Sequence, residues 1–260
     1  MGILSSKEKG HEDDNGVVGL TVLSWNIAGL HPYPVERATH IGDRINNLGP
    51  DVVLLQEVIS TTLPILKKKC TQYHFTDSSL VNYFNVVMTK KRRFKGSKEI
   101  MHKFEGSCMG RYLLVVETQL ASLPLAIMAS HLESLENFSE ERKTQLQSVF
   151  TQMQTYSASH AVVFGGDTNL REHECGEIGG VPEGICDVWE SRGSDESMKM
   201  TKVVRKEDDL SLVKRYDRVY YGAREGFSCT KFERIGNERI EQLGLFPSDH
   251  LGILVEFSLQ

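Results

Sequence analysis

Many short apolar runs limit the folds open to this chain of 260 residues. Short apolar runs bounded by turn residues are typical of β-strands. Strands are predicted over residues 20–25, 51–55, 83–89, 112–118, 125–130, 161–164, 216–221, 227–232 and 251–257. Apolar residues at helical spacing predict helices over 34–48, 61–69 and 139–156, and a short helix over 187–189. Ser139 is the expected N-cap of the third helix.

The predicted strands outnumber the helices, and several follow one another too closely to be joined by crossover helices. Parallel neighbours need such a connection, so antiparallel pairing is expected in parts of the sheets. Two sheets packed face to face, with helices outside, account for this order of elements and give an α/β fold. Residues 19–260 are expected to form one domain, while the polar and acidic residues 1–18 are expected to form a mobile tail.

Composition excludes several classes of protein. No apolar stretch approaches the ~18 residues of a membrane-spanning helix. The five cysteines form no CxxC pair, so they are interpreted as free thiols and not as a disulfide framework or a zinc site. A net charge of −5 lacks the basic footprint of most nucleic-acid binders. The basic runs 67–69 and 90–95 fit either a local phosphate track or a solvated loop.

Polar residues stand at one end of five of the predicted strands. These segments are Ser24-Trp25-Asn26, Gln56-Glu57, Ser130-His131, Gly165-Gly166-Asp167-Thr168-Asn169 and Ser248-Asp249-His250. Each alone is weak evidence, because a lone glutamate after a strand is usually a surface turn and asparagine is a common turn former. A buried strand end has little reason to hold an unpaired charge. Their joint occurrence therefore predicts that these side chains converge on one rim of the fold.

The predicted rim has the residue types that phosphodiester hydrolysis requires. A hard cation such as Mg²⁺ prefers oxygen ligands and keeps several waters, so one or two carboxylates suffice, with Glu57 as the first candidate. Asp167 is the candidate to orient and deprotonate water near the phosphorus. Donors are also needed where charge develops on the phosphoryl oxygens. The residues that could supply them are His131, His250, Asn26 and Asn169. No thiolate or paired-histidine set indicates zinc, and the chain contains no Walker loop.

The order and identity of these segments resemble the endonuclease/exonuclease/phosphatase superfamily. The resemblance extends from about residue 19 to the end of the chain. It implies a four-layer α/β sandwich of two packed mixed or antiparallel sheets with helices outside, and magnesium-dependent cleavage of phosphodiesters. The narrower segments 109–111, 131–134 and 166–171 resemble the members of this superfamily that act on 5′-tyrosyl DNA.

The resemblance implies a role for each matching residue around the metal. Glu57 would hold a single Mg²⁺, for which Mn²⁺ could substitute, with Asn26 and Asp249 in its coordination shell. Asp167 would activate the attacking water, and Asn169 would orient this water and the phosphate.

Further catalytic contacts are implied on the phosphate itself. His131, Ser134 and His250 would contact its oxygens. Asp217 would pair with His250 and favour the charged form, since a nearby carboxylate raises the pKa of an imidazole.

Two groups of residues would contact the substrate on either side of the phosphate. Tyr83 and Arg111 would face the tyrosine, and Arg171 the DNA strand. An apolar wall for the terminal nucleotide would be made by Leu210, Leu212 and Tyr216. Related enzymes have a tryptophan soon after the threonine that matches Thr201, whereas this sequence has Lys202. The wall is therefore expected to differ at that point.

The implied substrate is a 5′-phosphotyrosyl bond between DNA and a trapped topoisomerase 2 fragment, cleaved in DNA repair to leave a 5′-phosphate. The resemblance also implies a monomer without membrane contact, acting in the nucleus, with the cytoplasm as a second compartment. Alternatives are another phosphodiester on the same machinery (abasic-site DNA, a phosphoinositide, sphingomyelin or a poly(A) tail) and a catalytically inactive scaffold that binds a protein.

Overall fold

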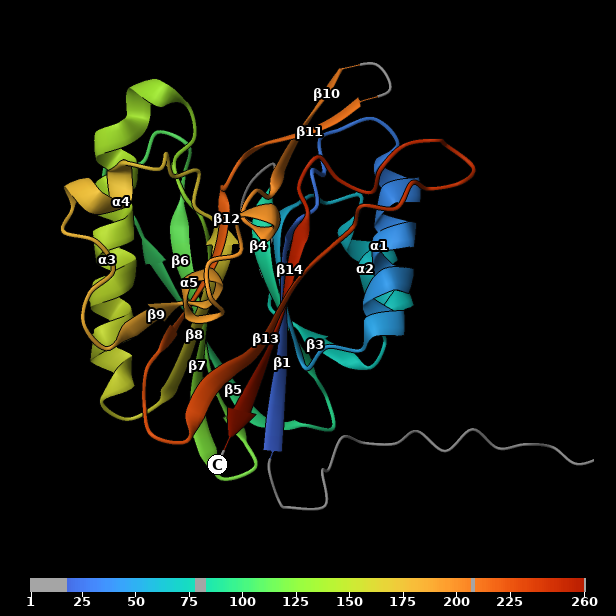
Figure 1. Ribbon diagram of the computed structural model, residues 1–260. Coiled ribbons are helices and arrows are strands. Elements are labelled where there is room, and N and C mark those ends of the chain that lie inside the picture. Colours follow the sequence, from blue (N-terminus) through green and yellow to red (C-terminus); the bar gives the residue numbers. More distant parts are fainter. Residues whose placement is uncertain (1–17, 78–82, 207–208, 260) are drawn as a thin grey trace, which may run out of the picture.

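The computed structural model describes residues 18–77, 83–206 and 209–259, so the tail predicted over residues 1–18 lies almost wholly outside the described residues. Two six-stranded sheets face each other, and helices cover their outer faces on both sides (Figure 1). This is the four-layer α/β sandwich expected from the sequence, and the predicted fold class is confirmed. None of the described helices is long and apolar enough to span a membrane.

The first sheet contains the amino-terminal strand and the last strand of the chain. Its order is β13 (Phe227–Ile235), β14 (Gly252–Leu259), β1 (Val18–Asn26), β2 (Val52–Val58), β4 (Phe84–Lys90) and β3 (Tyr73–Phe75). β1 and β2 are parallel, and the other neighbours are antiparallel. The crossover between β1 and β2 is α1 (Pro34–Leu48), which covers the outer face of this sheet with α2 (Leu63–Lys69).

The second sheet is built on the same plan. Its order is β5 (Phe94–Lys103), β6 (Tyr112–Leu120), β7 (Leu123–His131), β8 (Ala161–Asp167), β12 (Asp217–Gly222) and β9 (Ile185–Asp187). β7 and β8 are its parallel pair, joined by α3 (Ser139–Ser157). The smaller elements are the 3₁₀ turns 136–138 and 196–198, α4 (Glu174–Glu177), α5 (Val188–Ser191) and a separate hairpin of β10 (Lys202–Lys206) and β11 (Asp209–Lys214), at the top of Figure 1.

The central strands are apolar on both faces because each sheet is covered twice. In β2, Leu54 packs into the core between the sheets, while its neighbours Val53 and Leu55 pack with Ile41 and Ile45 of α1. Successive side chains of a strand point to opposite faces, so a strand covered on both sides is a continuous apolar run. This explains why these strands were recognisable in the sequence.

Strand β5 was missed in the sequence, and the predicted cap of the third helix was wrong. The basic run 90–95 leads directly into β5, an edge strand with exposed side chains from Lys95 to Glu99. Charged residues are common on edge strands because they oppose pairing with another chain, and they hide the strand pattern. Ser139 does not cap α3: it is the first residue of the helix, and its hydroxyl donates to Glu174 Oε1 over 2.7 Å.

Candidate active site

The polar strand ends meet at one rim of the sandwich. The carboxyl ends of β1 and β2 lie side by side, as Asn26 pairs with Gln56. In the second sheet, His131 at the end of β7 pairs with Asp167 at the end of β8, and Asp217 at the start of β12 lies opposite Asp167. The rim therefore collects residues that are far apart in the sequence.

Two of the residues at the rim have an unusual backbone conformation. Glu57 has φ 57° beside a register shift between Leu55 and Val58, and Asn169 has φ 51°. Residues other than glycine seldom adopt this left-handed conformation, and such strain is concentrated at functional sites. At Gly166, a Cβ atom would lie 2.0 Å from the carbonyl oxygen of Ser130, so only glycine permits the close approach of β7 and β8 beside Asp167.

Asp167 is the centre of the cluster and is buried. Asn26 Nδ2 donates to Asp167 Oδ2 over 2.9 Å and to Glu57 Oε1 over 3.0 Å. The Nε2 atoms of His131 and His250 lie 3.4 Å and 3.6 Å from Asp167 Oδ2. The backbone N–H of Asn169 donates to Asp167 Oδ1 over 3.0 Å. One carboxylate thus lies within reach of an amide and two imidazoles.

The two imidazoles differ in charge although both are buried. Burial lowers the pKa of His131 to about 3, so this ring is neutral at physiological pH. Burial also opposes the charge of His250, but the carboxylates of Asp217 and Asp167 outweigh it and raise its pKa to about 9. His250 Nδ1 donates to Asp217 Oδ2 over 2.7 Å, which holds the ring and directs Nε2 towards Asp167. The site combines one charged and one neutral donor.

The donor set fits a divalent cation. Ligand atoms of Glu57, His131 and Asp167 lie within 4.8 Å of one another. Burial and the nearby carboxylates of Asp167 and Asp249 raise the pKa of Glu57, although the hydrogen bond from Asn26 opposes this. His131 Nδ1 is buried and has no hydrogen-bond partner among the described residues. A divalent cation that prefers oxygen ligands would stabilise carboxylates that lie this close together.

Asp249 lies at the same rim but faces a different partner. Lys202 Nζ donates to Asp249 Oδ2, and His31 Nε2 lies 3.6 Å from the same oxygen. Burial alone would raise the pKa of Asp249, but the positive charges of His250 and Lys202 outweigh it, so the pKa is lowered. The contact of Lys202 with Asp249 was not predictable from the local pattern, because the two residues are 47 positions apart along the chain.

The residues expected to face the tyrosine lie together along a shallow cleft. The guanidinium carbon of Arg111 lies 5.1 Å from the centre of the Tyr83 ring, and this ring lies 5.9 Å from that of His131. Ser134 contacts one lining residue, Met109, through its hydroxyl, which lies 3.2 Å from Met109 Sδ; no described hydrogen bond joins Ser134 to the Asp167 cluster. The guanidinium of Arg111 and the ring of Tyr83 thus form a flat surface beside the Asp167 cluster.

The nucleotide side is described only in part. The guanidinium carbon of Arg171 lies 5.4 Å from the centre of the Tyr216 ring. Leu210 and Leu212 belong to β11, but their side chains lie outside the described residues, so the apolar wall stays a prediction.

Glu133 is a buried residue that the sequence analysis did not single out. Its carboxylate accepts hydrogen bonds from Ser107 Oγ (2.7 Å), Met109 N (2.9 Å) and Gln145 Nε2 (2.9 Å). Ser107 Oγ in turn accepts from Arg111 N over 2.8 Å. Glu133 therefore links segment 131–134 to the loop that carries Arg111. A glutamate between an apolar residue and a serine directly after a buried strand was the available signal.

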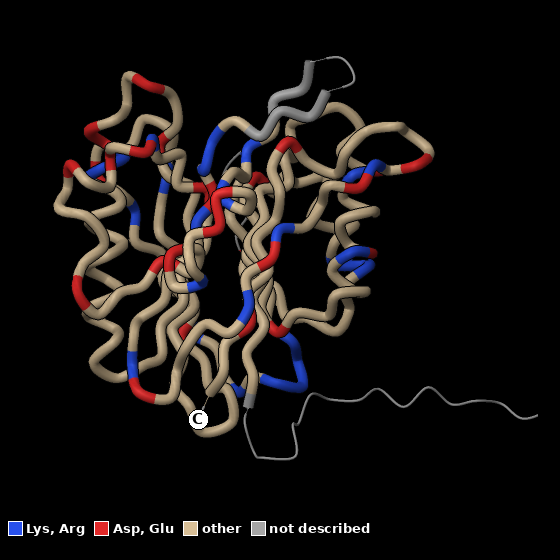
Figure 2. Tube along the Cα trace, viewed as in Figure 1, with Lys and Arg blue, Asp and Glu red and all other residues tan. Residues whose placement is uncertain are grey.

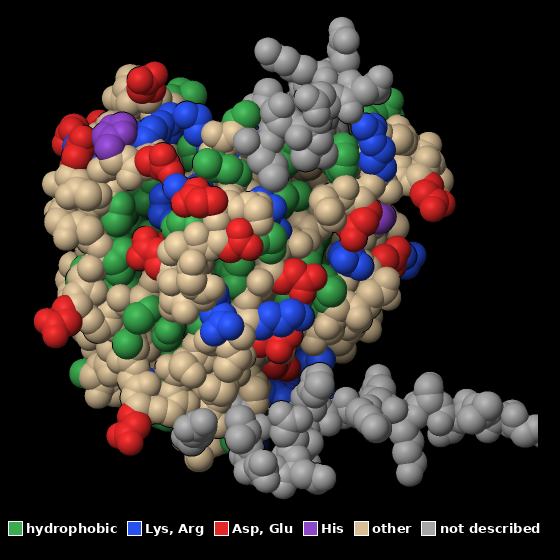
Figure 3. Space-filling model, in the orientation of Figure 1, with side chains coloured by type: hydrophobic (Ala, Val, Ile, Leu, Met, Phe, Trp, Pro, Cys, Tyr) green, Lys and Arg blue, Asp and Glu red, His purple; other side chains and the backbone are tan. Residues whose placement is uncertain are grey.

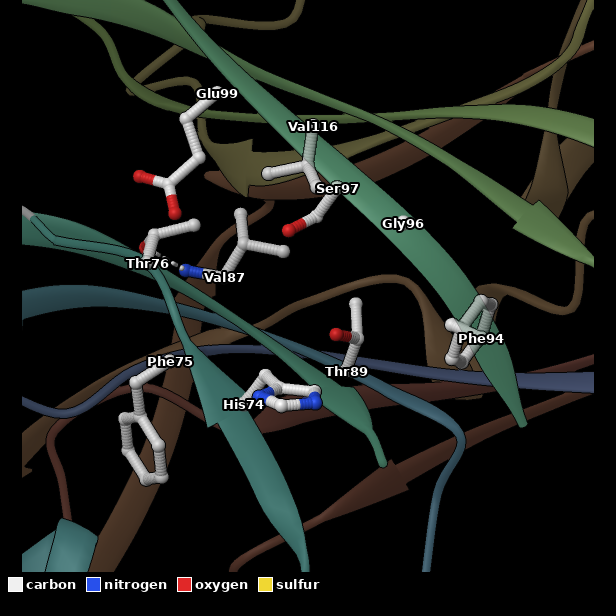
Figure 4. A pocket seen from close by; sticks show the side chains of 10 residues that line it. All are labelled: His74, Phe75, Thr76, Val87, Thr89, Phe94, Gly96, Ser97, Glu99 and Val116. Atoms are coloured by element: carbon white, nitrogen blue, oxygen red, sulfur yellow. Dashed lines mark hydrogen bonds between the residues drawn. The ribbon is translucent and has the colours of Figure 1, made fainter. Parts of the chain in front are cut away.

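A larger cavity, of about 210 Å³, is separate from this rim. It opens between β3, β4 and β5, and its lining includes His74, Thr89 and Glu99 (Figure 4). Thr89 pairs with Val52 at the start of β2, whereas the polar cluster follows the end of that strand. The cavity therefore lies towards the opposite end of the sheet and contains no residue of the cluster.

The basic runs do not reach the rim either. Lys69 pairs with Asp43, and the run 90–95 follows β4 at the end of the sheet away from the cluster (Figure 2). On the face seen in Figure 3, acidic and basic side chains are interspersed, and the described residues form no continuous basic track there. The phosphate track considered for these runs is thus not adjacent to Asp167.

Residues 23–250 match the model of the Endonuclease/Exonuclease/phosphatase family. The chain belongs to this family. It is 37% identical to tyrosyl-DNA phosphodiesterase 2 of Gallus gallus over 247 residues, which cover 92% of this chain and 67% of the relative. It is 34% identical to the Homo sapiens protein of the same name, over 95% of this chain and 70% of the relative.

Solved structures of this family agree with the fold. The crystal structure of D. rerio TDP2 complexed with single strand DNA product matches with a TM-score of 0.86 and 33% identity, over 92% of this chain and 98% of that one. TDP2 from C. elegans matches with a TM-score of 0.82 and 29% identity, over 92% and 75% of the two chains. The family resemblance seen in the sequence is confirmed.

Proposed function

We propose that the chain hydrolyses the bond between a tyrosine side chain and the 5′-phosphate of DNA, leaving a 5′-phosphate end, in DNA repair. The observation that carries this proposal is the buried cluster on Asp167, which joins Asn26, His131 and His250 at one rim. Identity of 34–37% to enzymes named tyrosyl-DNA phosphodiesterase 2, over most of the chain, supports the choice of substrate. So does the likeness to a structure that holds a single-stranded DNA product.

Asp167 is the proposed base for the attacking water. Hydrogen bonds from Asn26 and from the backbone of Asn169 hold its carboxylate in one orientation. A positioned general base contributes about 10² to 10⁴ in rate. In this scheme the side-chain amide of Asn169 orients the water and the phosphate.

The histidines are the proposed donors to the phosphoryl oxygens. His250, whose pKa is raised to about 9 by Asp217 and Asp167 against the effect of burial, carries its charge at neutral pH. A fixed positive donor stabilises the charge that builds on the phosphoryl oxygens in the transition state. Neutral His131 donates from one ring nitrogen without adding repulsion to its charged neighbour. Ser134 is proposed to complete the phosphate contacts.

A divalent cation is proposed for this site, with Mg²⁺ as the working ion and Mn²⁺ as a substitute. Glu57, with Asn26 and Asp249, would hold it, and it would neutralise charge on the phosphoryl oxygens. Glu57 fits this role because its carboxylate is hydrogen-bonded to the same Asn26 amide as Asp167.

The cleft of Tyr83 and Arg111 is the proposed site of the departing tyrosine. A phenol has a pKa near 10, so phenolate leaves with little help from an acid. The guanidinium of Arg111, beside the ring of Tyr83, suits the departing phenolate, which is both aromatic and negatively charged. On the other side, Arg171, Leu210, Leu212 and Tyr216 are proposed to receive the nucleotide.

The biological setting is also a proposal. The proposed substrate is DNA carrying a trapped topoisomerase 2 fragment, and the proposed working form is a monomer. The nucleus is the proposed site of action, since the substrate is chromosomal DNA, with the cytoplasm as a second compartment.

A panel of substrates tests this proposal. The enzyme should cleave an oligonucleotide with a 5′-phosphotyrosyl end in the presence of Mg²⁺, and it should act weakly on 3′-phosphotyrosyl ends, abasic sites and phosphoinositides. The Asp167→Asn variant is the control for contaminating nucleases. Equal or faster cleavage of 3′-tyrosyl ends or abasic sites would refute the substrate assignment and leave the family chemistry in place.

A further inference from the structure

Lys202, the first residue of β10, extends its amine into the active site. Its Nζ donates to Asp249 Oδ2 and lies 3.1 Å from His250 Nε2. The same His250 nitrogen lies 3.6 Å from Asp167 Oδ2. The side chain of Lys202 is 24% exposed, so the amine lies where the cluster opens to solvent.

The backbone on both sides of Lys202 is paired, which fixes where its side chain begins. Val203 N donates to the carbonyl oxygen of Asp249 over 2.8 Å. Leu251 N donates to the carbonyl oxygen of Thr201 over 2.8 Å. The position of Lys202 is therefore set by the segment that also carries Asp249, and only the side chain itself needs to move for the amine to change partners.

The charges around this amine favour an anionic ligand. A lysine ammonium has three N–H donors; Asp249 accepts from one of them, and the charged His250 cannot accept from another. A phosphodiester that enters the site approaches the carboxylates of Glu57, Asp167 and Asp249, which repel it. A cation at the opening offsets that repulsion, and a lysine acts as a point charge on phosphate.

We propose that Lys202 is a substrate-binding residue whose ammonium moves from Asp249 to a non-bridging oxygen of the phosphate at the 5′ end of the DNA strand. The inference rests on the proposed function for the identity of the substrate. Before the substrate binds, Asp249 Oδ2 holds the ammonium in place for the incoming phosphate, and Oδ1 remains for the proposed cation. Lys202 thereby selects strand ends that carry a 5′-phosphoryl group.

Binding of the reaction product tests this role without turnover. The probes are two labelled single-stranded oligonucleotides of the same sequence, one with a 5′-phosphate and one with a 5′-hydroxyl, measured by fluorescence anisotropy in Mg²⁺ buffer. The wild-type enzyme should prefer the phosphorylated end. Lys202→Met should lose about tenfold to a hundredfold of that preference, which is the value of a hydrogen bond to a charged group. Lys202→Arg, which keeps the charge, should retain most of it.

A matched control separates this contact from the overall charge of the protein. Lys231 on β13 pairs with Glu256 and Glu233 in the first six-stranded sheet, outside the hairpin that carries Lys202, and Lys231→Met removes the same charge there. This variant should keep the wild-type preference for the phosphorylated end. Lys202→Gln is a second neutral variant should Lys202→Met fail to fold. A purely structural Lys202 would weaken binding of both probes equally, and that outcome, or an unchanged preference, overturns the inference.

Kinetics distinguish a failure here from a failure of the proposed function. On 5′-tyrosyl DNA, Lys202→Met should raise KM about tenfold or more with a smaller effect on kcat, as expected for a contact made before the transition state. The slope of log(kcat/KM) against log salt should become shallower by about 0.7, the value for one phosphate contact on a single strand. If the wild-type enzyme cleaves 5′-tyrosyl DNA and Lys202→Met has the same KM, only the lysine contact is refuted. If the wild-type enzyme does not cleave 5′-tyrosyl DNA but its preference for the 5′-phosphorylated probe still depends on Lys202, only the substrate assignment is refuted.

Discussion

Substitution of Glu133 tests whether its hydrogen bonds hold the loop that carries Arg111 beside the site. This buried carboxylate accepts three hydrogen bonds, from Ser107 Oγ, Met109 N and Gln145 Nε2. Two of them, from Ser107 and Gln145, go to Oε2, so in Glu133→Gln the new amide oxygen can take that place and accept both, while its NH₂ group faces Met109 N. Gln145 cannot simply rotate its own amide, because its Oε1 already accepts from the backbone N–H of residue 133 over 2.8 Å.

The size of the effect follows from these contacts. One of the three accepted bonds, from Met109 N, is lost, at about 1.5 kcal/mol, the lower end for a bond to a charged group. The free energy of unfolding, measured by urea denaturation, should therefore fall by about 1.5 kcal/mol. Glu136→Gln, on an exposed turn three residues later, is the control and should change it by less than about 0.5 kcal/mol.

The same substitution should also affect the substrate. Met109, whose N–H loses its acceptor, lies two residues before Arg111, so the loop that carries Arg111 loses part of its anchor. KM for 5′-tyrosyl DNA should rise by about tenfold, since the loop must become ordered on binding. A loss of stability below about 0.5 kcal/mol, with an unchanged KM, would refute the role assigned to this carboxylate.

Three further substitutions test the proposed roles at the rim. Asp167→Asn should keep the fold and lower kcat by about 10² to 10⁴, and a residual rate within about tenfold of wild type would assign the base elsewhere. Glu57→Gln should shift the Mg²⁺ titration of activity to higher concentrations, because a charged ligand is lost; an unchanged titration would remove it from the metal site. Asp217→Asn should move the alkaline limb of the pH–rate profile to lower pH. His250 must be protonated to donate, its pKa is raised to about 9 chiefly by Asp217 against burial, and without Asp217 it loses its proton earlier as pH rises. An unaltered limb would exclude Asp217 from this role.

The sequence was most informative where a strand is buried on both faces. A polar residue directly after such a run, as at Glu57, His131 and Asp167, has to be paired with other polar groups, and parallel pairs such as β7 and β8 bring these ends to one edge. That reasoning predicted the rim. It could not predict β5, whose exposed charged residues carry no buried pattern.

The supporting contacts were not predictable from local pattern. Glu133 bonds to residues 24 and 26 positions away, and Lys202 bonds to a residue 47 positions away. Periodicity reports which face of an element is buried, and it contains no information on which distant polar groups will meet. Ser139 illustrates the same limit, because its hydroxyl found a tertiary partner in Glu174 in place of a helix cap.

The central claim is that water, activated at Asp167, attacks the phosphorus of a 5′-tyrosyl end and releases tyrosine. Cleavage in water enriched in oxygen-18, followed by mass spectrometry of both products, tests it most directly. The expected products are an oligonucleotide whose 5′-phosphate carries one labelled oxygen and unlabelled free tyrosine. Release of phosphotyrosine with a 5′-hydroxyl end, or label in the tyrosine, would contradict the claim.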